Sequence, residues 1–303
     1  MEKIKRVAIL GAGAMGAYFA AAFFDTDGID ITVVARDQRY ETLQRQGLVV
    51  NGKPYAVPVS HPDEVQPPAD LIIVALKHHH LPEAVGDLKN LVGDGTAIIS
   101  VMNGLDSEAV IGEVYGKDKL LYAVSVGIDA VRHGNQVVFS KPGVHYFGEQ
   151  RNEQLSPRVR LIQEAFDRAG IAYETPADMI RILWWKFMIN VGMNQSSAVM
   201  RAPYGVFQSS PQAQAVMRAL MDEVIILAKA AGVNLVDQDV NDWNAVLNSL
   251  APAGKTSMLQ DMEAGRKTEV EIFGGKVAAL GRQYGIPTPV NQTLMNIIQV
   301  LES

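Results

Sequence analysis

The most informative absence from this sequence of 303 residues is that of cysteine. Without thiols, the chain cannot form disulfides, thiolate metal sites or iron–sulfur clusters, and it cannot use a cysteine nucleophile. A sequence without cysteine is compatible with the reducing cytoplasm, and we expect a cytoplasmic protein.

Basic charge and long apolar runs are also scarce. Lys and Arg number 27 against 33 Asp and Glu, so the formal net charge is −6. Because nucleic-acid surfaces need clustered cations and no basic stripe is present, we expect no nucleic-acid partner. No uncharged segment is long enough to span a bilayer, and the first strand pattern begins too early for a signal peptide. We therefore expect no membrane attachment.

A glycine-rich loop near the start of the chain organises the first part of the sequence. The apolar run at residues 7–10 is followed by Gly11-Ala12-Gly13-Ala14-Met15-Gly16 and then by an apolar segment with helical character. This strand, turn and helix carry the G-x-G-x-x-G spacing, in which the glycines permit a sharp turn, approach of a pyrophosphate and close helix packing. The pattern predicts a dinucleotide site at the helix N-terminus.

The next β-rich run, residues 31–35, ends at Arg36. In dinucleotide-binding folds, the residue after this strand faces the adenosine ribose: an acidic residue binds the 2′-hydroxyl of NAD, and an arginine accommodates the 2′-phosphate of NADP. Arg36 therefore favours NADP(H). The alternative is that Arg36 is a surface residue and Asp37 binds the ribose.

Two further apolar runs predict parallel strands that end on polar side chains. Residues 71–76 are followed by Lys77, and residues 97–102 are followed by Asn103. Because ligands of doubly wound sheets bind beyond the carboxyl ends of the strands, we expect Lys77 and Asn103 at one edge. Residues 47–60 predict a hairpin that turns at Asn51-Gly52, and residues 121–148 predict antiparallel strands that complete the sheet. The consecutive histidines at 78–80 do not have metal-ligand spacing, and we expect no metal site.

The pattern changes from alternating strands and helices to helices alone near residue 178. A chain of this length favours two domains. We therefore predict an α/β protein with an N-terminal Rossmann-type dinucleotide-binding domain at residues 1–177 and a second, all-helical domain at residues 178–303.

The first helix of the second domain is predicted to run from Asp178 to about Met200 and is almost entirely apolar. Within it, Lys186, Asn190 and Asn194 follow an i, i+4, i+8 spacing that aligns them on one side. A lysine flanked by aromatic residues loses hydration when it is buried, and it then needs a partner or a ligand. The alternative is a surface lysine with two asparagines that cap neighbouring loops.

Two later residues carry weaker signals. Ser257 begins a Ser-x-x-Gln pattern, which predicts that it caps another helix. Glu269 lies further along in a segment with several glutamates, and its spacing alone does not single it out.

These motifs, in this order and spacing, resemble the ketopantoate reductase family (2-dehydropantoate 2-reductases) over nearly the whole chain. The matching features are GAGAMG at 11–16, Arg36, Lys77, Asn103-Gly104, Lys186 with Asn190 and Asn194, SMLQD at 257–261 and TEVE at 268–271. The resemblance implies NADPH-dependent reduction of 2-dehydropantoate to (R)-pantoate, a step of pantothenate biosynthesis.

The resemblance also implies roles for single residues. Lys186 corresponds to the family's proton donor, and Glu269 is placed with it as a catalytic residue. The implied substrate ligands are Asn103, Lys186, Asn190, Asn194 and Ser257. The implied cofactor contacts beyond the glycine loop and Arg36 are Lys77, Asn103, Ala130 and Glu269.

Two positions depart from the family pattern and leave the substrate open. Gln195 stands where a proline commonly follows the second asparagine, and Tyr204 replaces a further asparagine that contacts the substrate. The alternative is therefore a reductase of another bulky 2-keto acid on the same scaffold. A non-catalytic NADPH-binding regulator is a more remote alternative. The sequence is compatible with a monomer or a homodimer.

Overall fold

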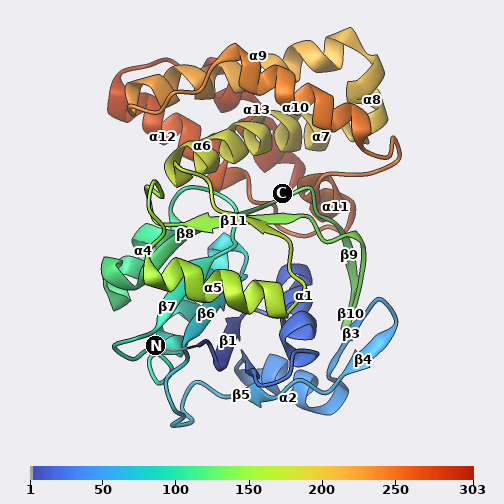
Figure 1. Cartoon of the computed structure of the whole chain (residues 1–303). Coiled ribbons are helices and arrows are strands. Elements are labelled where there is room, and N and C mark those ends of the chain that lie inside the picture. The colour runs from blue at the N-terminus through green and yellow to red at the C-terminus, as the bar shows by residue number, and fades with distance from the viewer. Residues whose placement is uncertain (1–2) are drawn as a thin grey trace. The chain divides into compact units, whose positions relative to one another are not determined.

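The computed structural model describes residues 3–303, and the chain divides into two compact units between Met179 and Ile180. The boundary expected from the sequence, between residues 177 and 178, lies two positions earlier. The first unit contains the sheets, and the second is built from helices (Figure 1). No helix within residues 3–303 is long and apolar enough to cross a bilayer.

The main sheet of the first unit has eight strands, and its central members are short runs of buried apolar residues, as expected for parallel strands covered on both faces. All neighbours are parallel except β8 and β11, which are antiparallel. In spatial order the strands are β12 (Tyr173–Glu174), β11 (Val144–Gly148), β8 (Leu120–Val126), β7 (Ala97–Ser100), β6 (Leu71–Val74), β1 (Arg6–Leu10), β2 (Asp30–Val34) and β5 (Val59–Ser60).

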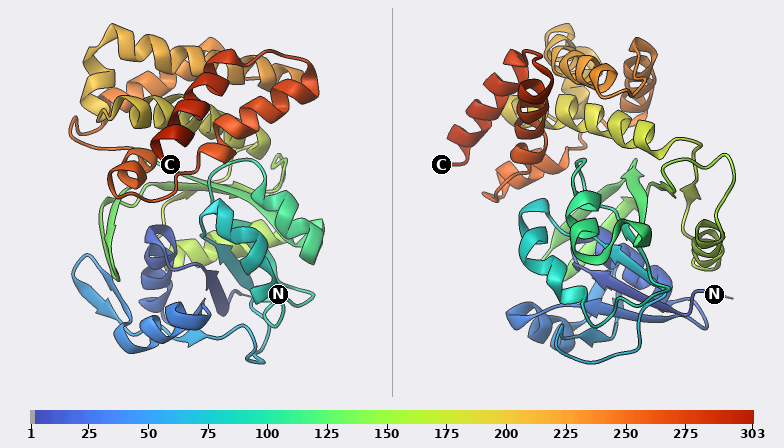
Figure 2. Two further views of the ribbon diagram at one scale, coloured as in Figure 1. Left: turned by 180° about the vertical axis from the view of Figure 1, so that it is seen from behind. Right: turned by 90° about the vertical axis from the view of Figure 1, so that its left-hand side faces the viewer.

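Helices cover both faces of this sheet. Successive residues of a strand point to opposite sides, so the apolar strands present buried side chains to both layers of helices. Val7 and Ile9 of β1 share a hydrophobic cluster with α1 (Ala14–Phe24) and α5 (Pro157–Arg168). Ala8 and Leu10 share another cluster with residues of α3 (Leu81–Ala84), η2 (Val85–Leu88) and α4 (Ser107–Tyr115), on the opposite face (Figure 2). The remaining bounds are α2 (Asp37–Gln46), η1 (His78–His80) and η3 (Lys117–Lys119). The predicted doubly wound α/β fold is confirmed.

A second sheet of four strands corrects one prediction. Its strands are β4 (Lys53–Tyr55), β3 (Leu48–Val50), β10 (Gln136–Lys141) and β9 (Asp129–His133), in that order. The hairpin at Asn51-Gly52 is confirmed, since both residues have positive φ, 49° and 78°. The prediction that all strands of residues 121–148 complete the main sheet is wrong for β9 and β10, because β10 pairs in parallel with β3.

The second unit is helical throughout, as predicted, but its first helix is not continuous. A π turn, η4 (Asn190–Asn194), separates α6 (Met179–Ile189) from α7 (Gln195–Met200), so the prediction of one uninterrupted helix to Met200 is wrong. The other elements are α8 (Tyr204–Ser209), α9 (Pro211–Ala230), α10 (Asp237–Ser249), α11 (Ser257–Glu263), η5 (Val270–Ile272), α12 (Gly274–Tyr284) and α13 (Pro289–Leu301). The π turn packs against α9 and α11.

Candidate functional site

The carboxyl edge of the main sheet carries four of the residues or loops predicted from the sequence. In the strand order β2, β1, β6, β7, the segments that follow the strands hold Arg36, the glycine loop, Lys77 and Asn103, respectively. Because neighbouring strands lie about 4.8 Å apart, these segments form a row along one edge. The expectation that Lys77 and Asn103 follow strands ending at the same edge is confirmed by the direct parallel pairing of β6 with β7.

The glycine loop has the backbone geometry that its spacing predicts. Gly11 has φ of 99°, and a Cβ atom there would lie 2.7 Å from the carbonyl oxygen of Ala75. A Cβ at Gly16 would overlap the carbonyl oxygen of Gly11, so helix α1 approaches the loop too closely for any side chain. At Gly13, by contrast, the nearest atom to such a Cβ would be 3.9 Å away. The space beside Gly13 at the start of α1 fits a pyrophosphate.

Arg36 is oriented by a buried carboxylate. Its Nε donates to Oδ2 of Asp87 at 2.9 Å, and its Nη2 also contacts this carboxylate. Asp87 is buried, whereas the Arg36 side chain is about half exposed (53%), so this arginine is held by a buried carboxylate while part of it stays accessible to solvent. The alternative ribose ligand, Asp37, is exposed and has φ of 49°, a left-handed conformation that is uncommon outside glycine.

A second arginine lies directly against the glycine loop. Nη2 of Arg39 donates to the carbonyl oxygen of Ala12 at 2.6 Å. Burial, and secondarily the nearby Arg132 of β9, lowers the pKa of Arg39 to about 10, so the guanidinium stays charged at neutral pH. The sequence places Arg39 one helical turn after Arg36, but no sequence signal brings Arg132 or Asp87 to this region.

A buried chain of hydrogen bonds braces the loop that contains Asn103. The hydroxyl of Ser100 donates to that of Ser107 at 2.8 Å, and Ser107 donates to the Glu108 carboxyl at 3.0 Å. Burial raises the pKa of Glu108 to about 7. Both ends of the segment between β7 and α4 are therefore fixed, and within it Gly104 has φ of 98°.

The helical unit carries the polar residues predicted on its first helix. Lys186 lies on α6, Asn190 begins the π turn and Asn194 ends it. Both asparagines are buried, with exposed fractions of 4% and 6%, and Lys186 is partly buried. Burial lowers the pKa of Lys186 to about 8, which leaves the amine mostly protonated at pH 7 and able to lose its proton a little above it.

Ser257 is exposed and is the first residue of α11, but it is not the cap that the sequence predicted. The cap is Thr256, whose hydroxyl oxygen accepts from the backbone N–H of Leu259 at 3.1 Å. The Thr256 hydroxyl also donates to that of Ser197 on α7 at 3.2 Å. This bond ties the start of α11, and with it Ser257, to the helix that follows the π turn.

The remaining predicted residues lie in both units. Glu269 is buried just before η5, and Ala130 is partly buried on β9, where it pairs with Phe139. Tyr204 begins α8, and its hydroxyl donates to the carbonyl oxygen of Lys255 at 3.3 Å, on the segment that leads to Ser257. The structure thus gathers Arg36, the glycine loop, Lys77 and Asn103 on one edge of the first unit, and Lys186, Asn190 and Asn194 on one helical run of the second.

Gln195, which departs from the family pattern, has both amide N–H groups engaged within the helical unit. Its side chain is fully buried, and its amide donates to the carbonyl oxygen of Val191 and to Oδ1 of Asn291.

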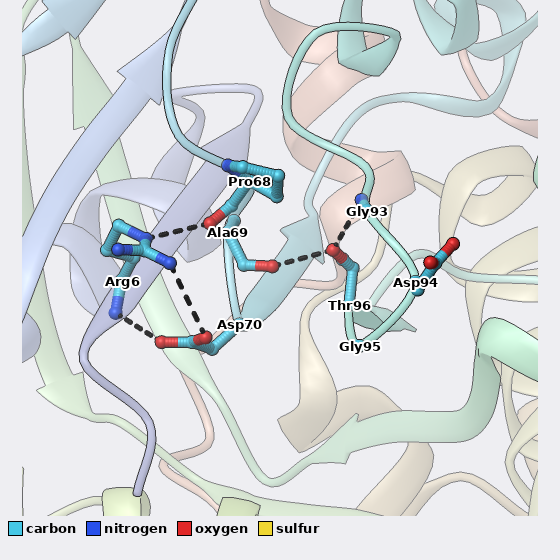
Figure 3. A pocket seen from close by; sticks show the side chains of 8 residues that line it. All are labelled: Arg6, Pro68, Ala69, Asp70, Gly93, Asp94, Gly95 and Thr96. Carbon is cyan, nitrogen blue, oxygen red and sulfur yellow. Dashed lines mark hydrogen bonds and ion pairs between the residues drawn. The ribbon is translucent and has the colours of Figure 1, made fainter. Parts of the chain in front are cut away.

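A pocket at the opposite edge of the main sheet is not a candidate site. It is formed at the amino ends of β1, β6 and β7, where Arg6, Asp70 and Thr96 lie (Figure 3). Arg6 donates to Pro68 and pairs with Asp70, while the Thr96 hydroxyl donates to the carbonyl oxygen of Ala69. These groups satisfy one another, and ligands of this fold bind at the other edge.

Comparison with known proteins agrees with this arrangement. Residues 7–152 match the family model described as ketopantoate reductase PanE/ApbA, and residues 178–302 match that of its C-terminal domain. A 2-dehydropantoate 2-reductase of Archaeoglobus fulgidus is 28% identical over 99% of each chain.

Solved structures also resemble this chain over nearly its whole length. The 2-dehydropantoate 2-reductase of Geobacter metallireducens is 27% identical, with a TM-score of 0.86 over 97% of this chain and 99% of that one. A D-mandelate dehydrogenase solved with NADH and anilino(oxo)acetate has a TM-score of 0.88 over 98% of each chain at 21% identity, a likeness of fold alone. Together, the two family models extend over both units, and the chain belongs to the ketopantoate reductase family.

Proposed function

We propose that this protein reduces 2-dehydropantoate to (R)-pantoate with NADPH. The observation that carries the proposal is the partly buried Lys186, with its lowered pKa, on the same helical run as two buried asparagines. The first unit, with its glycine loop and half-exposed Arg36, is the proposed NADP-binding domain. The second is the proposed substrate and catalytic domain.

The residues proposed to hold the cofactor lie mostly in the segments that follow β2, β1, β6 and β7 at the carboxyl edge of the main sheet. The loop from Gly11 to Gly16 would take the pyrophosphate at the start of α1, and Arg36 would bind the 2′-phosphate through the donors that Asp87 leaves unused. Lys77, Asn103 and Ala130 are proposed as further cofactor contacts, and Glu269 is proposed as a cofactor-binding and catalytic residue. NADPH, when bound, supplies the hydride.

Lys186 is the proposed acid. During reduction, negative charge develops on the ketone oxygen, and a positioned ammonium stabilises that charge and donates the proton. With a pKa of about 8, Lys186 is charged at neutral pH but gives up its proton more readily than an ordinary lysine. Glu269 is proposed to orient the amine.

Neutral donors are proposed to orient the substrate. Asn190, Asn194 and Ser257, together with Asn103, would donate hydrogen bonds to the carboxylate and hydroxyl groups of the keto acid. Orientation of this kind accelerates a reaction because the reacting atoms are held in place before the chemical step.

The test is the loss of absorbance at 340 nm when ketopantoate is added to enzyme and NADPH. We expect turnover with ketopantoate and a lower kcat/KM for other bulky 2-keto acids in a panel at fixed NADPH. A higher kcat/KM for another member of the panel would reassign the substrate. NADPH binding without turnover of any keto acid would favour the regulatory alternative and refute the proposal.

A further inference from the structure

The break in the helix that carries Lys186 changes how its polar residues line up. In a regular α-helix each residue advances about 100°, so residues four and eight positions after Lys186 would lie about 40° and 80° around the axis. In the π turn of Asn190–Asn194, the hydrogen bonds span five residues instead of four, so each residue advances less. The wider turn therefore returns Asn194 toward the side of Lys186.

Side chains from the next turn hold the carbonyl groups of the π turn. Nε2 of Gln195 donates to the carbonyl oxygen of Val191 at 2.9 Å, and the Ser196 hydroxyl donates to that of Gly192 at 2.6 Å. Gln195 and Ser196 are both fully buried. Because buried carbonyl groups need partners, these two side chains stabilise the irregular backbone at the place where it departs from α-helical geometry.

Gln195 also anchors the π turn to two other helices. Its Nε2 donates to Oδ1 of Asn291 on α13 at 2.8 Å, and Nδ2 of Asn291 donates to Oε2 of Glu223 on α9 at 2.7 Å. Glu223 also accepts from the backbone N–H groups of Val290 and Asn291, at the start of α13. The carboxylate fixes the orientation of the Asn291 amide, and Asn291 in turn fixes that of Gln195.

The packing around Gln195 is adapted to this amide. Its Oε1 is buried and has no hydrogen-bond donor within residues 3–303. A Cβ atom at Gly274 would overlap Oε1, so a glycine leaves the space that the amide oxygen fills. A Cβ at Gly192 would lie 2.5 Å from Cγ of Met221, so the π turn itself rests directly on α9. Leaving one amide oxygen unpaired in the core has a cost, which indicates that the two hydrogen bonds donated by the Gln195 amide are important for the fold.

We propose that Gln195 is a positioning residue that maintains the π turn, and thereby aligns Asn194 with Asn190 and Lys186 for the 2-keto acid. The inference rests on the proposed function, which assigns the substrate to these three side chains. Gln195 acts through the helix backbone and touches no reacting atom.

The first test replaces Gln195 by Met, which has a similar length and flexibility but donates no hydrogen bond. The matched control is Gln208→Met: the Gln208 amide also donates to two backbone carbonyls, those of Leu247 and Leu250, but it lies on α8 away from the π turn. We expect Gln195→Met to raise KM for the keto acid at least tenfold while KM for NADPH stays within twofold. We expect Gln208→Met to lower Tm and to change neither KM by more than twofold.

A milder variant, Ser196→Ala, keeps the test informative if Gln195→Met does not fold. It removes the donor to Gly192 and should raise the keto-acid KM two- to fivefold. A keto-acid KM that is unchanged in the variants, or no higher than in Gln208→Met, would overturn the inference.

A crystal structure of Gln195→Met gives a readout that needs no substrate. We expect α-helical hydrogen bonding through residues 190–194 and a rotated Asn194. An intact π turn with Asn194 in place would refute the inference, even if ketopantoate were not the substrate. Conversely, a lost π turn would support it even if the wild-type protein failed to reduce ketopantoate.

Discussion

Two buried titratable groups in the first unit, His145 and Glu108, should change the free energy of unfolding in opposite directions as the pH falls. His145 on β11 is 2% exposed, and its Nδ1 lies 2.7 Å from the Ser125 hydroxyl. The rings of Tyr18 and Phe19 lie 5.4 and 4.7 Å from the imidazole ring, centroid to centroid. Nε2 has no hydrogen-bond partner in the described part of the chain. Burial lowers the pKa of His145 from 6.5 to about 4.

The lowered pKa means that the folded protein holds His145 neutral while the unfolded chain takes up a proton below pH 6.5. Stability from this group is therefore lost as the pH falls from about 6.5 to about 4, and between pH 7 and pH 5 the loss is about 2 kcal/mol. Glu108 behaves in the opposite way. Burial raises its pKa from 4.5 to about 7, so the folded state takes up its proton first and gains about 2 kcal/mol over the same interval.

The two contributions nearly cancel in the wild type, and single variants separate them. We expect His145→Asn to gain about 2 kcal/mol relative to wild type between pH 7 and pH 5, and Glu108→Gln to lose about 2 kcal/mol. The assay is urea unfolding followed by far-UV circular dichroism at pH 7, 6 and 5. A loss of packing in either variant shifts the free energy of unfolding equally at every pH. If all three proteins showed the same pH dependence, the reasoning would be refuted.

Three further predictions concern the proposed site. In Arg36→Gln, the ratio of kcat/KM for NADPH to kcat/KM for NADH should fall about 10- to 100-fold, because a hydrogen bond to a charged group contributes about 1.5–3 kcal/mol. An unchanged ratio would exclude Arg36 from the 2′-phosphate site. The kcat/KM for the keto acid should fall as the pH rises through about 8, where Lys186 loses its proton. A kcat/KM that stays constant up to about pH 10 would contradict the role of Lys186 as the acid. Gly13→Ala should raise KM for NADPH about tenfold and leave Tm nearly unchanged, whereas Gly16→Ala should lower Tm because its Cβ would overlap Gly11. A lower Tm in Gly13→Ala with an unchanged Tm in Gly16→Ala would show that the roles of the two glycines are misassigned.

Local patterns in the sequence predicted the elements that depend on neighbouring residues. The glycine spacing fixed the turn after β1, and the apolar runs identified the parallel strands that end before Lys77 and Asn103. These predictions succeeded because strand, turn and helix at this place each follow from a short stretch of chain. The family resemblance extended them to residues such as Glu269, for which spacing gives no signal.

Most features that the sequence did not predict involve contacts between distant segments. The pairing of β10 with β3 joins residues more than 80 positions apart, and only the folded chain shows that it builds a separate sheet. Gln195, which follows the π turn, donates to Asn291, and these two residues lie 96 positions apart in the sequence. The Ser-x-x-Gln pattern misplaced the cap of α11 by one residue, because Thr256 satisfies the same chemistry and also reaches Ser197.

The most direct measurement of the central claim is the comparison of Lys186→Met with the wild type in ketopantoate turnover and in NADPH binding. Loss of a positioned acid should lower kcat about 10²- to 10⁴-fold, and the dissociation constant of NADPH should stay within about twofold. A variant that keeps kcat within about fivefold of wild type would contradict the assignment of Lys186, and with it the proposed mechanism.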